Sequence, residues 1–220
     1  MSTISVLLCT HNSRALLPIA IESYLSQEYE NKELIVIDDG DDLIADMVKG
    51  IPGVHYHLVP AQNLSQKRNA GIRLATGEII VHFDSDDWSG PGRISHQVEH
   101  LIAHNLKVVG YSKAWWYDTR RSLATYATCG LWGATLCYDR QWALEHPWDE
   151  THTTCEDAWF LGQLGQNEVG ALEGGSHFVA LAHNGNAQRP FGEPGWRIIG
   201  NEMLPEGFTN YWRKHERSKG

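Results

Sequence analysis

Three carboxylates lie within four residues of this chain, at Asp84, Asp86 and Asp87. They follow the apolar run at residues 78–83, which has the composition of a buried strand. In open α/β sheets, ligands bind at the edge where the carboxyl ends of the strands lie. Clustered carboxylate oxygens suit Mg²⁺ or Mn²⁺, which proteins commonly hold together with substrate phosphates. The run therefore predicts a metal–diphosphate site, although a solvated acidic turn is the ordinary explanation for one isolated Asp-x-Asp.

Polar residues also follow two earlier apolar runs, and two cations lie on a predicted helix before the acidic run. These residues are Thr10, His11 and Asn12 after the first run, Asp38 and Asp39 after the second, and Lys67 and Arg68 on the helix. The carboxyl ends of parallel strands meet at one edge of a sheet, so we expect these side chains to lie close together. A carboxylate there can bind a base or ribose, and Arg68 can bind phosphate through its fork of donors.

Each of these residues has an ordinary structural explanation when it is taken alone. Asn12 suits a helix cap, Asp38 and Asp39 with Gly40 suit a turn, and the two cations suit a solvated helix face. Their joint placement at three strand ends favours a binding site.

The composition limits the class of protein. The chain has 220 residues, of which 42% are hydrophobic, and a formal net charge of −9. These values are typical of one folded domain, and the negative charge argues against a nucleic-acid partner. The apolar runs are too short for a transmembrane helix, and the N-terminus lacks the pattern of a signal peptide. The four cysteines form no Cys-x-x-Cys pair, so we expect no structural zinc and a cytoplasmic protein, either free or peripheral to the membrane.

The first half of the chain alternates strands with helices, which predicts an α/β fold with a mostly parallel central sheet. Strands are expected at residues 4–9, 34–37, 54–59 and 79–83. Helices are expected from Asn12 or Ser13 to about Ser26, at residues 43–48, and at residues 65–76 with Gly77 as the C-terminal cap.

The second half predicts shorter elements, some of them antiparallel. Helices are expected at residues 91–104 and 156–164, and strands at residues 108–110, around residues 115–117, and at residues 133–138 and 178–182. From Arg189 onward the chain is rich in proline, glycine and charge, which suits a lid or a loosely packed end.

The order and spacing of these pieces resemble family 2 glycosyltransferases, which have the GT-A fold. The matching segments are residues 6–12, 27–40, 68–72, 75–80 and 83–87, and later residues 133–138, 155–157 and 183–186. The resemblance implies a single GT-A domain over residues 1–220, with helices flanking the sheet and a small antiparallel element on the acceptor side. Its nucleotide-sugar-binding half would be about residues 1–105, its acceptor and catalytic half about 106–188, and its tail or lid about 189–220.

The resemblance also implies roles for individual residues. The donor would be a nucleotide-sugar, most simply a UDP-sugar, bound by Thr10, His11, Asn12, Asp38, Asp39, Lys67, Arg68, Asp84 and Ser85. Mn²⁺ or Mg²⁺ would be held by Asp84, Asp86, Asp87 and His183. Such enzymes transfer one sugar to an acceptor hydroxyl with inversion, for which Asp157 would be the general base and Glu156 its neighbour.

Two other classes of function share parts of this pattern. A nucleotidyltransferase has a similar sheet, but it usually carries a glycine-rich loop after the first strand, where this chain has Thr10-His11-Asn12-Ser13-Arg14. A non-catalytic GT-A-like binding protein is disfavoured because Asp86 and Asp157 are both present. The class of acceptor and the oligomeric state stay open.

Tryptophans are further candidates because aromatic faces often bind sugars. Trp132, Trp159 and Trp196 could serve in this way, yet core packing is the expectation for each of them.

Overall fold

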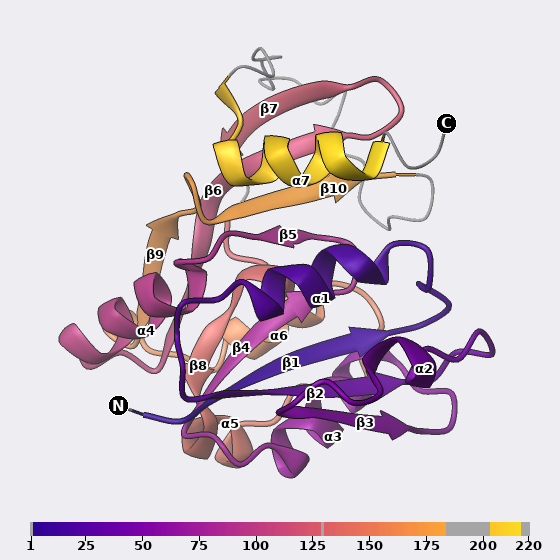
Figure 1. Cartoon of the computed structure of the whole chain (residues 1–220). Coiled ribbons are helices and arrows are strands. Elements are labelled where there is room, and N and C mark those ends of the chain that lie inside the picture. The colour runs from indigo at the N-terminus through magenta and orange to yellow at the C-terminus, as the bar shows by residue number, and fades with distance from the viewer. Residues whose placement is uncertain (1, 129, 184–202, 217–220) are drawn as a thin grey trace.

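The computed structural model describes residues 2–128, 130–183 and 203–216. Its centre is a sheet whose main path runs β3-β2-β1-β4-β8-β6-β10-β5, with β7 and β9 both paired to β6 (Figure 1). The strands are β1 (Ile4–Thr10), β2 (Lys32–Asp38), β3 (Val54–Leu58), β4 (Ile79–Asp84), β5 (Trp88–Ser89), β6 (Val108–Asp118), β7 (Leu123–Thr128), β8 (Cys137–Asp139), β9 (Val169–Glu173) and β10 (Phe178–Ala182).

The first four strands are parallel to one another, as predicted. The sheet changes character at β8, which runs antiparallel to both β4 and β6. Strands β7 and β5 are also antiparallel to their partners, whereas β9 and β10 are parallel to β6. The prediction of a mostly parallel α/β sheet with a smaller antiparallel part is confirmed.

Helices cover both faces of the sheet. They are α1 (Leu17–Leu25), α2 (Ala45–Val48), α3 (Leu64–Leu74), α4 (Arg93–Ala103), α5 (Arg140–Glu145), α6 (Glu156–Leu161) and α7 (Glu206–Glu216), with a 3₁₀ turn η1 at Gly133–Thr135. Successive side chains of a strand point to opposite faces, so Val6 and Leu8 pack with α1 and α4, whereas Leu7 packs with α3 and α5. The two apolar layers hold the carboxyl ends of β1, β2 and β4 at one edge.

The described part of the C-terminal segment is firmly packed. Helix α7 lies against β10 and its neighbouring strands (Figure 1). Phe208 is 1% exposed and contacts the rings of Trp88 and Tyr117. A loosely packed end is therefore wrong for this helix, while residues 184–202 and 217–220 lie outside the described residues. In the part of the chain that is described, no helix has the length and apolar character needed to cross a membrane.

Two predicted helix ends are wrong. Helix α1 begins at Leu17, not at Asn12 or Ser13, because Asn12 adopts a left-handed backbone (φ 50°). Helix α3 ends at Leu74, and Gly77 is not its cap. Gly77 instead allows two backbones to approach, since a Cβ there would lie 2.6 Å from the Ser5 amide nitrogen.

Three predicted strands also differ from the structure. Residues 133–138 form a 3₁₀ turn followed by the short β8, because the Thr135 hydroxyl binds the backbone of Tyr111 and Trp132 instead of leaving the segment free to pair along its length. The two short strands expected at residues 108–110 and around 115–117 form one strand, β6, which pairs along its second half with both β7 and β10.

Candidate active site

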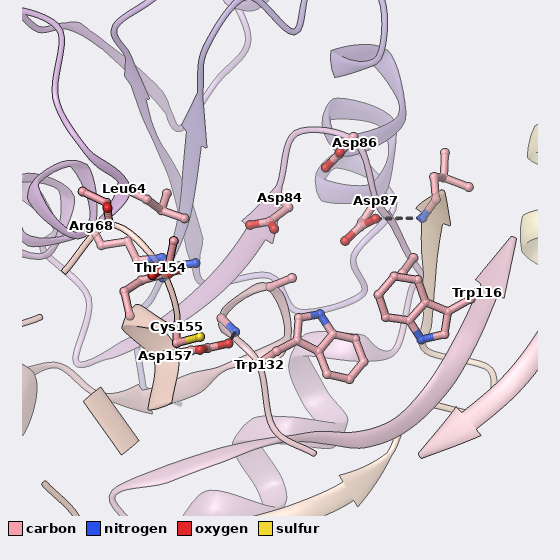
Figure 2. A pocket seen from close by; sticks show the side chains of 16 residues that line it. Leu64, Arg68, Asp84, Asp86, Asp87, Trp116, Trp132, Thr154, Cys155 and Asp157 are labelled. Atoms are coloured by element: carbon pink, nitrogen blue, oxygen red, sulfur yellow. Dashed lines mark hydrogen bonds and ion pairs between the residues drawn. The ribbon is translucent and has the colours of Figure 1, made fainter. Parts of the chain in front are cut away.

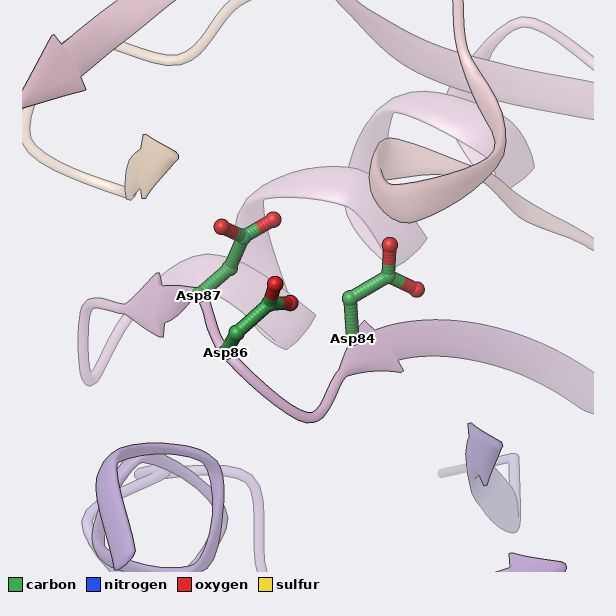
Figure 3. Close-up of side chains that lie close together, drawn as sticks. All are labelled: Asp84, Asp86 and Asp87. Carbon is green, nitrogen blue, oxygen red and sulfur yellow. The ribbon is translucent and has the colours of Figure 1, made fainter. Parts of the chain in front are cut away.

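The acidic run forms a compact cluster at the end of β4. Asp84, Asp86 and Asp87 each offer a carboxylate oxygen, and these atoms lie within 4.8 Å of one another (Figure 3). Burial raises the pKa of Asp84 to about 6; the neighbouring Asp86 adds to this effect, and the Arg68 guanidinium opposes it. Burial also raises the pKa of Asp87 well above its ordinary value, and repulsion from the carboxylates of Asp86 and Asp84 raises it further. Close carboxylates that resist ionisation suit a site that receives a cation.

The cluster is fixed from the far side by β10. The backbone N–H of Leu181 donates to Asp87 Oδ1 at 2.9 Å, the dashed contact in Figure 2. His183, one residue past the strand, places Nε2 2.8 Å from Asp86 Oδ2. Residues 86 and 183 meet because β10 pairs with β6 and β5 beside the acidic loop. Three carboxylates and one imidazole nitrogen are donors that fit Mn²⁺ or Mg²⁺.

The ends of β1 and β2 form a second polar centre around Asp39, whose side chain is 3% exposed. Its carboxylate accepts hydrogen bonds from Lys67 Nζ at 2.7 Å and from the Gln62 amide at 2.9 Å, and it lies 3.1 Å from His11 Nδ1. Burial alone would raise the pKa of Asp39, but these partners outweigh it and hold the pKa low. Lys67 also donates to the carbonyl of Thr10 at 3.1 Å.

Two of the residues predicted to contact the nucleotide instead bind and stabilise the loop after β2. Asp38 is fully buried, and it accepts hydrogen bonds from the Gly40 amide at 3.0 Å and the Tyr56 hydroxyl at 2.8 Å. Asn12 Oδ1 accepts from the amides of Asp41 and Asp42 at 2.8 and 2.9 Å. The turn explanation therefore holds for Asp38, and Asn12 caps a loop, not a helix.

Arg68 links α3 to the second half of the chain. Its guanidinium donates to Glu156 Oε1 at 2.9 Å and lies over the ring of Trp148, 4.2 Å from the centroid. The Cα of Gly133 packs against the same guanidinium, where a side chain would collide with it. The Gly133 amide in turn donates to Asp157 Oδ2 at 3.3 Å. Through this one glycine the predicted phosphate ligand and the predicted base are held together.

A cavity of about 480 Å³ brings these groups together (Figure 2). Of the predicted site residues, it is lined by Arg68, Asp84, Asp86, Asp87, Glu156 and Asp157. Those outside its wall are Thr10, His11, Asn12, Asp38, Asp39, Lys67, Ser85 and His183, although His183 contacts Asp86 in that wall. The carboxylate cluster and the predicted base therefore face one space.

Sequence reasoning missed part of the cavity wall. Trp116 and Trp132 both line it, although core packing was expected for Trp132. Trp132 does pack against the core as well as lining the cavity. Core packing is wrong for Trp159, which is 54% exposed and stacks on His152 outside the cavity. Trp196 and residues 184–186 lie outside the described residues. The local signal for the wall was only the aromatic character of these positions, which a buried strand shares.

Comparison with known proteins decides the family. The model of "Glycosyl transferase family 2" matches residues 5–134, more than half of the chain. The chain belongs to glycosyl transferase family 2. The match ends at the η1 turn, so it includes the acidic cluster and Trp132 but not Asp157 or His183.

Curated relatives of this family 2 chain match about half of it. Putative glycosyltransferase EpsE of Bacillus subtilis (strain 168) is 36% identical over 115 residues, which are 49% of this chain and 41% of EpsE. O-antigen biosynthesis glycosyltransferase WbnJ of Escherichia coli is 31% identical over 116 residues, or 50% of this chain and 46% of WbnJ. The chain thus matches less than half the length of these relatives.

Solved structures show the same fold. The 1–349 form of S. aureus TarS in complex with UDP-GlcNAc superposes with a TM-score of 0.67 at 16% identity, covering 84% of this chain and 60% of that one. Mannosyltransferase PcManGT from Pyrobaculum calidifontis, in complex with GDP-Man and Mn²⁺, gives a TM-score of 0.64 at 17% identity, covering 82% of this chain and 56% of that one. The predicted GT-A fold is confirmed.

Proposed function

We propose that this chain transfers one sugar, with inversion, from a nucleotide diphosphate donor to an acceptor hydroxyl. The observation that carries the proposal is that the carboxylates of Asp84, Asp86 and Asp87 share a cavity with Asp157. A metal–diphosphate site and a carboxylate base in one space are the two groups that direct displacement requires.

The donor side would be formed by the first half of the chain. Arg68 would bind the diphosphate, and Asp39, held by Lys67, would bind the nucleoside together with Thr10, His11 and Asn12. A divalent cation held by the acidic cluster and His183 would neutralise the charge that develops on the departing diphosphate. We propose UDP as the nucleotide, because TarS binds UDP-GlcNAc and WfaP of Escherichia coli is named for UDP-Glc.

The acceptor side would be served by Asp157. Its carboxylate takes the proton of the acceptor hydroxyl while that oxygen bonds to the anomeric carbon, and the bond from that carbon to the diphosphate oxygen breaks. The Gly133 amide donates to Asp157 Oδ2 and the Ala158 amide donates to Oδ1, and each of these oxygens keeps a further acceptor site. Glu156 is instead paired with the Arg68 guanidinium. We therefore assign the base to Asp157 and give Glu156 a supporting role for Arg68.

We propose a cytoplasmic location on the basis of the free cysteines. Cys9, Cys137 and Cys155 are free cysteines in the structure. Unpaired thiols suit a reducing compartment, which supports the cytoplasm.

The test is release of nucleoside diphosphate from a panel of UDP-, GDP-, CDP-, TDP- and ADP-sugars, with Mn²⁺, Mg²⁺ or chelator and a mixture of glycoside acceptors. We expect release from one nucleotide class, with a rate that depends on metal. Asp157→Asn should keep donor binding and lower the rate by about 10²–10⁴-fold, as for loss of a general base. The surface variant Asp46→Asn is the matched control, since Asp46 pairs with the exposed Arg14 and lies outside the cavity wall. Near-normal turnover in Asp157→Asn would show that another residue is the general base.

A further inference from the structure

Two tryptophans form an aromatic surface inside the cavity. Trp116 comes from β6 and Trp132 from the turn before η1, and their ring centroids lie 5.6 Å apart with planes 25° from parallel. In Figure 2 the two indoles lie beside each other below the aspartates, and their near-parallel planes make them an offset stack in which Trp116 backs Trp132. Trp116 is buried and Trp132 is only partly buried, so the accessible part of this surface is Trp132.

The indole of Trp132 is held rigidly next to the proposed base. Its ring packs edge to face on Phe178, with centroids 5.9 Å apart. The next residue along the chain is Gly133, whose amide donates to Asp157 at 3.3 Å and whose Cα lies against Arg68. One short turn therefore sets the distance between an aromatic face and the carboxylate that would receive a proton.

The charges of the cavity wall limit what can lie on that face. The charged side chains of the wall are Asp84, Asp86, Asp87, Glu156, Asp157 and Arg68. Arg68 is paired with Glu156, so the surroundings of Asp157 are negative. An anionic acceptor group would be repelled there, and an alkyl chain would cover carboxylates without giving them hydrogen-bond donors, which is costly.

A sugar ring meets both demands. Its C–H face is apolar enough to stack on an indole, and its rim of hydroxyls can donate to the surrounding carboxylates. On the basis of the proposed transfer reaction, we infer that Trp132, backed by Trp116, is the stacking platform of an acceptor subsite, and that the acceptor is a sugar whose attacking hydroxyl lies toward Asp157.

Fluorine NMR of protein labelled with fluorotryptophan tests this inference without knowledge of the natural acceptor. The Trp132 resonance is assigned with Trp132→Phe, and the exposed Trp159, assigned with Trp159→Phe, is the control outside the cavity. The probes are methyl glycosides of glucose, galactose, mannose and N-acetylglucosamine, with glycerol as a polyol without a ring, each added with and without UDP and Mn²⁺.

We expect at least one glycoside to shift the Trp132 resonance in a saturable way while Trp159 stays in place. Glycerol should leave both unchanged. An unmoved Trp132 with every glycoside, or an equal shift with glycerol, would overturn the subsite. UDP-GlcNAc is titrated separately, and a Trp132 shift that it causes but no glycoside causes would assign the ring to the donor sugar and equally overturn the subsite.

Kinetics give a second readout once a glycoside acceptor is found. Trp132→Ala should raise the acceptor KM by about tenfold or more, the scale of one lost aromatic contact, and Trp132→Phe should restore part of it. Transfer of the donor sugar to water and the affinity for UDP should fall by much less than transfer to the acceptor. If donor hydrolysis falls as far as transfer, Trp132 serves the donor and the inference fails. Failure of UDP to bind at all would refute the proposed function but not the subsite. The NMR titration with glycosides in the absence of nucleotide tests the subsite separately.

Discussion

Alanine at position 133 should damage the diphosphate side of the cavity through Arg68. A Cβ on Gly133 would lie 2.8 Å from Arg68 Cζ and 3.0 Å from Nη1, and Nη2 would be closer still. Ordinary contacts of this kind are about 3.5–4.0 Å, so the guanidinium must move by about 1 Å. Arg68 Nη1 donates to Glu156 at 2.9 Å, and such a move would break or badly stretch that bond.

Two magnitudes follow from this displacement. Overpacking a tight site costs about 1–3 kcal/mol, which we expect as the loss in the free energy of unfolding. A charge-assisted hydrogen bond contributes about 1.5–3 kcal/mol, so UDP should bind about 10- to 100-fold more weakly if Arg68 holds its diphosphate. Denaturant unfolding measures the first effect, and calorimetric titration of UDP in Mn²⁺ measures the second.

Two controls isolate the role of Arg68. Gly92→Ala places a Cβ no closer than 3.3 Å to the nearest atom, in the ring of His177, and should leave UDP affinity unchanged. In an Arg68→Ala background, Gly133→Ala should lose most of its effect, because the colliding group is gone. Equal stability and UDP affinity in Gly133→Ala and the parent would refute the packing of this glycine on Arg68.

Two further substitutions test the fold and the metal site. Burial alone would raise the pKa of Glu33, but hydrogen bonds from Ser5 and Thr76 hold it below its ordinary value. Ionised Glu33 therefore stabilises the fold at pH values above its pKa in the unfolded chain. This contribution is lost as the pH falls through the pKa of Glu33 in the folded protein. Glu33→Gln should cost about 1–3 kcal/mol of unfolding free energy at neutral pH, and the gap should shrink below about pH 4.5; a gap independent of pH would contradict this. His183→Ala should raise the Mn²⁺ concentration needed for UDP binding by about tenfold or more. If the Mn²⁺ titration curves of the variant and the parent coincide, the role of His183 is structural.

The sequence predicted the parts of the fold that depend on local pattern. Strand runs such as residues 79–83 are short, apolar and closed by turn residues, so the residue pattern alone places β4 and the carboxylates at its end. The parallel order followed from the alternation of strands with helices. These features need no knowledge of distant contacts.

The rest depended on contacts between residues far apart in the chain. Asn12 resembles a helix cap, but its side-chain Oδ1 accepts hydrogen bonds from the backbone amides of residues 41–42. Trp132 resembles a core residue, and its ring packs on Trp116 and Phe178, which are distant in the chain, while it also lines the cavity. Asp38 and Asp39 are neighbours of one type and both side chains are shielded from solvent, yet Asp38 binds the Gly40 amide and Tyr56, whereas Asp39 binds Lys67 and the Gln62 amide.

The central claim is that the acidic cluster holds the metal that binds the donor diphosphate beside Asp157. The most direct test is calorimetric titration of UDP into the protein with Mn²⁺ and with chelator, for the parent, Asp86→Asn and the surface control Asp46→Asn. We predict that binding requires Mn²⁺ in the parent and in Asp46→Asn and is lost in Asp86→Asn. UDP binding that is equally strong with chelator, or that Asp86→Asn retains in full with Mn²⁺, would contradict the account.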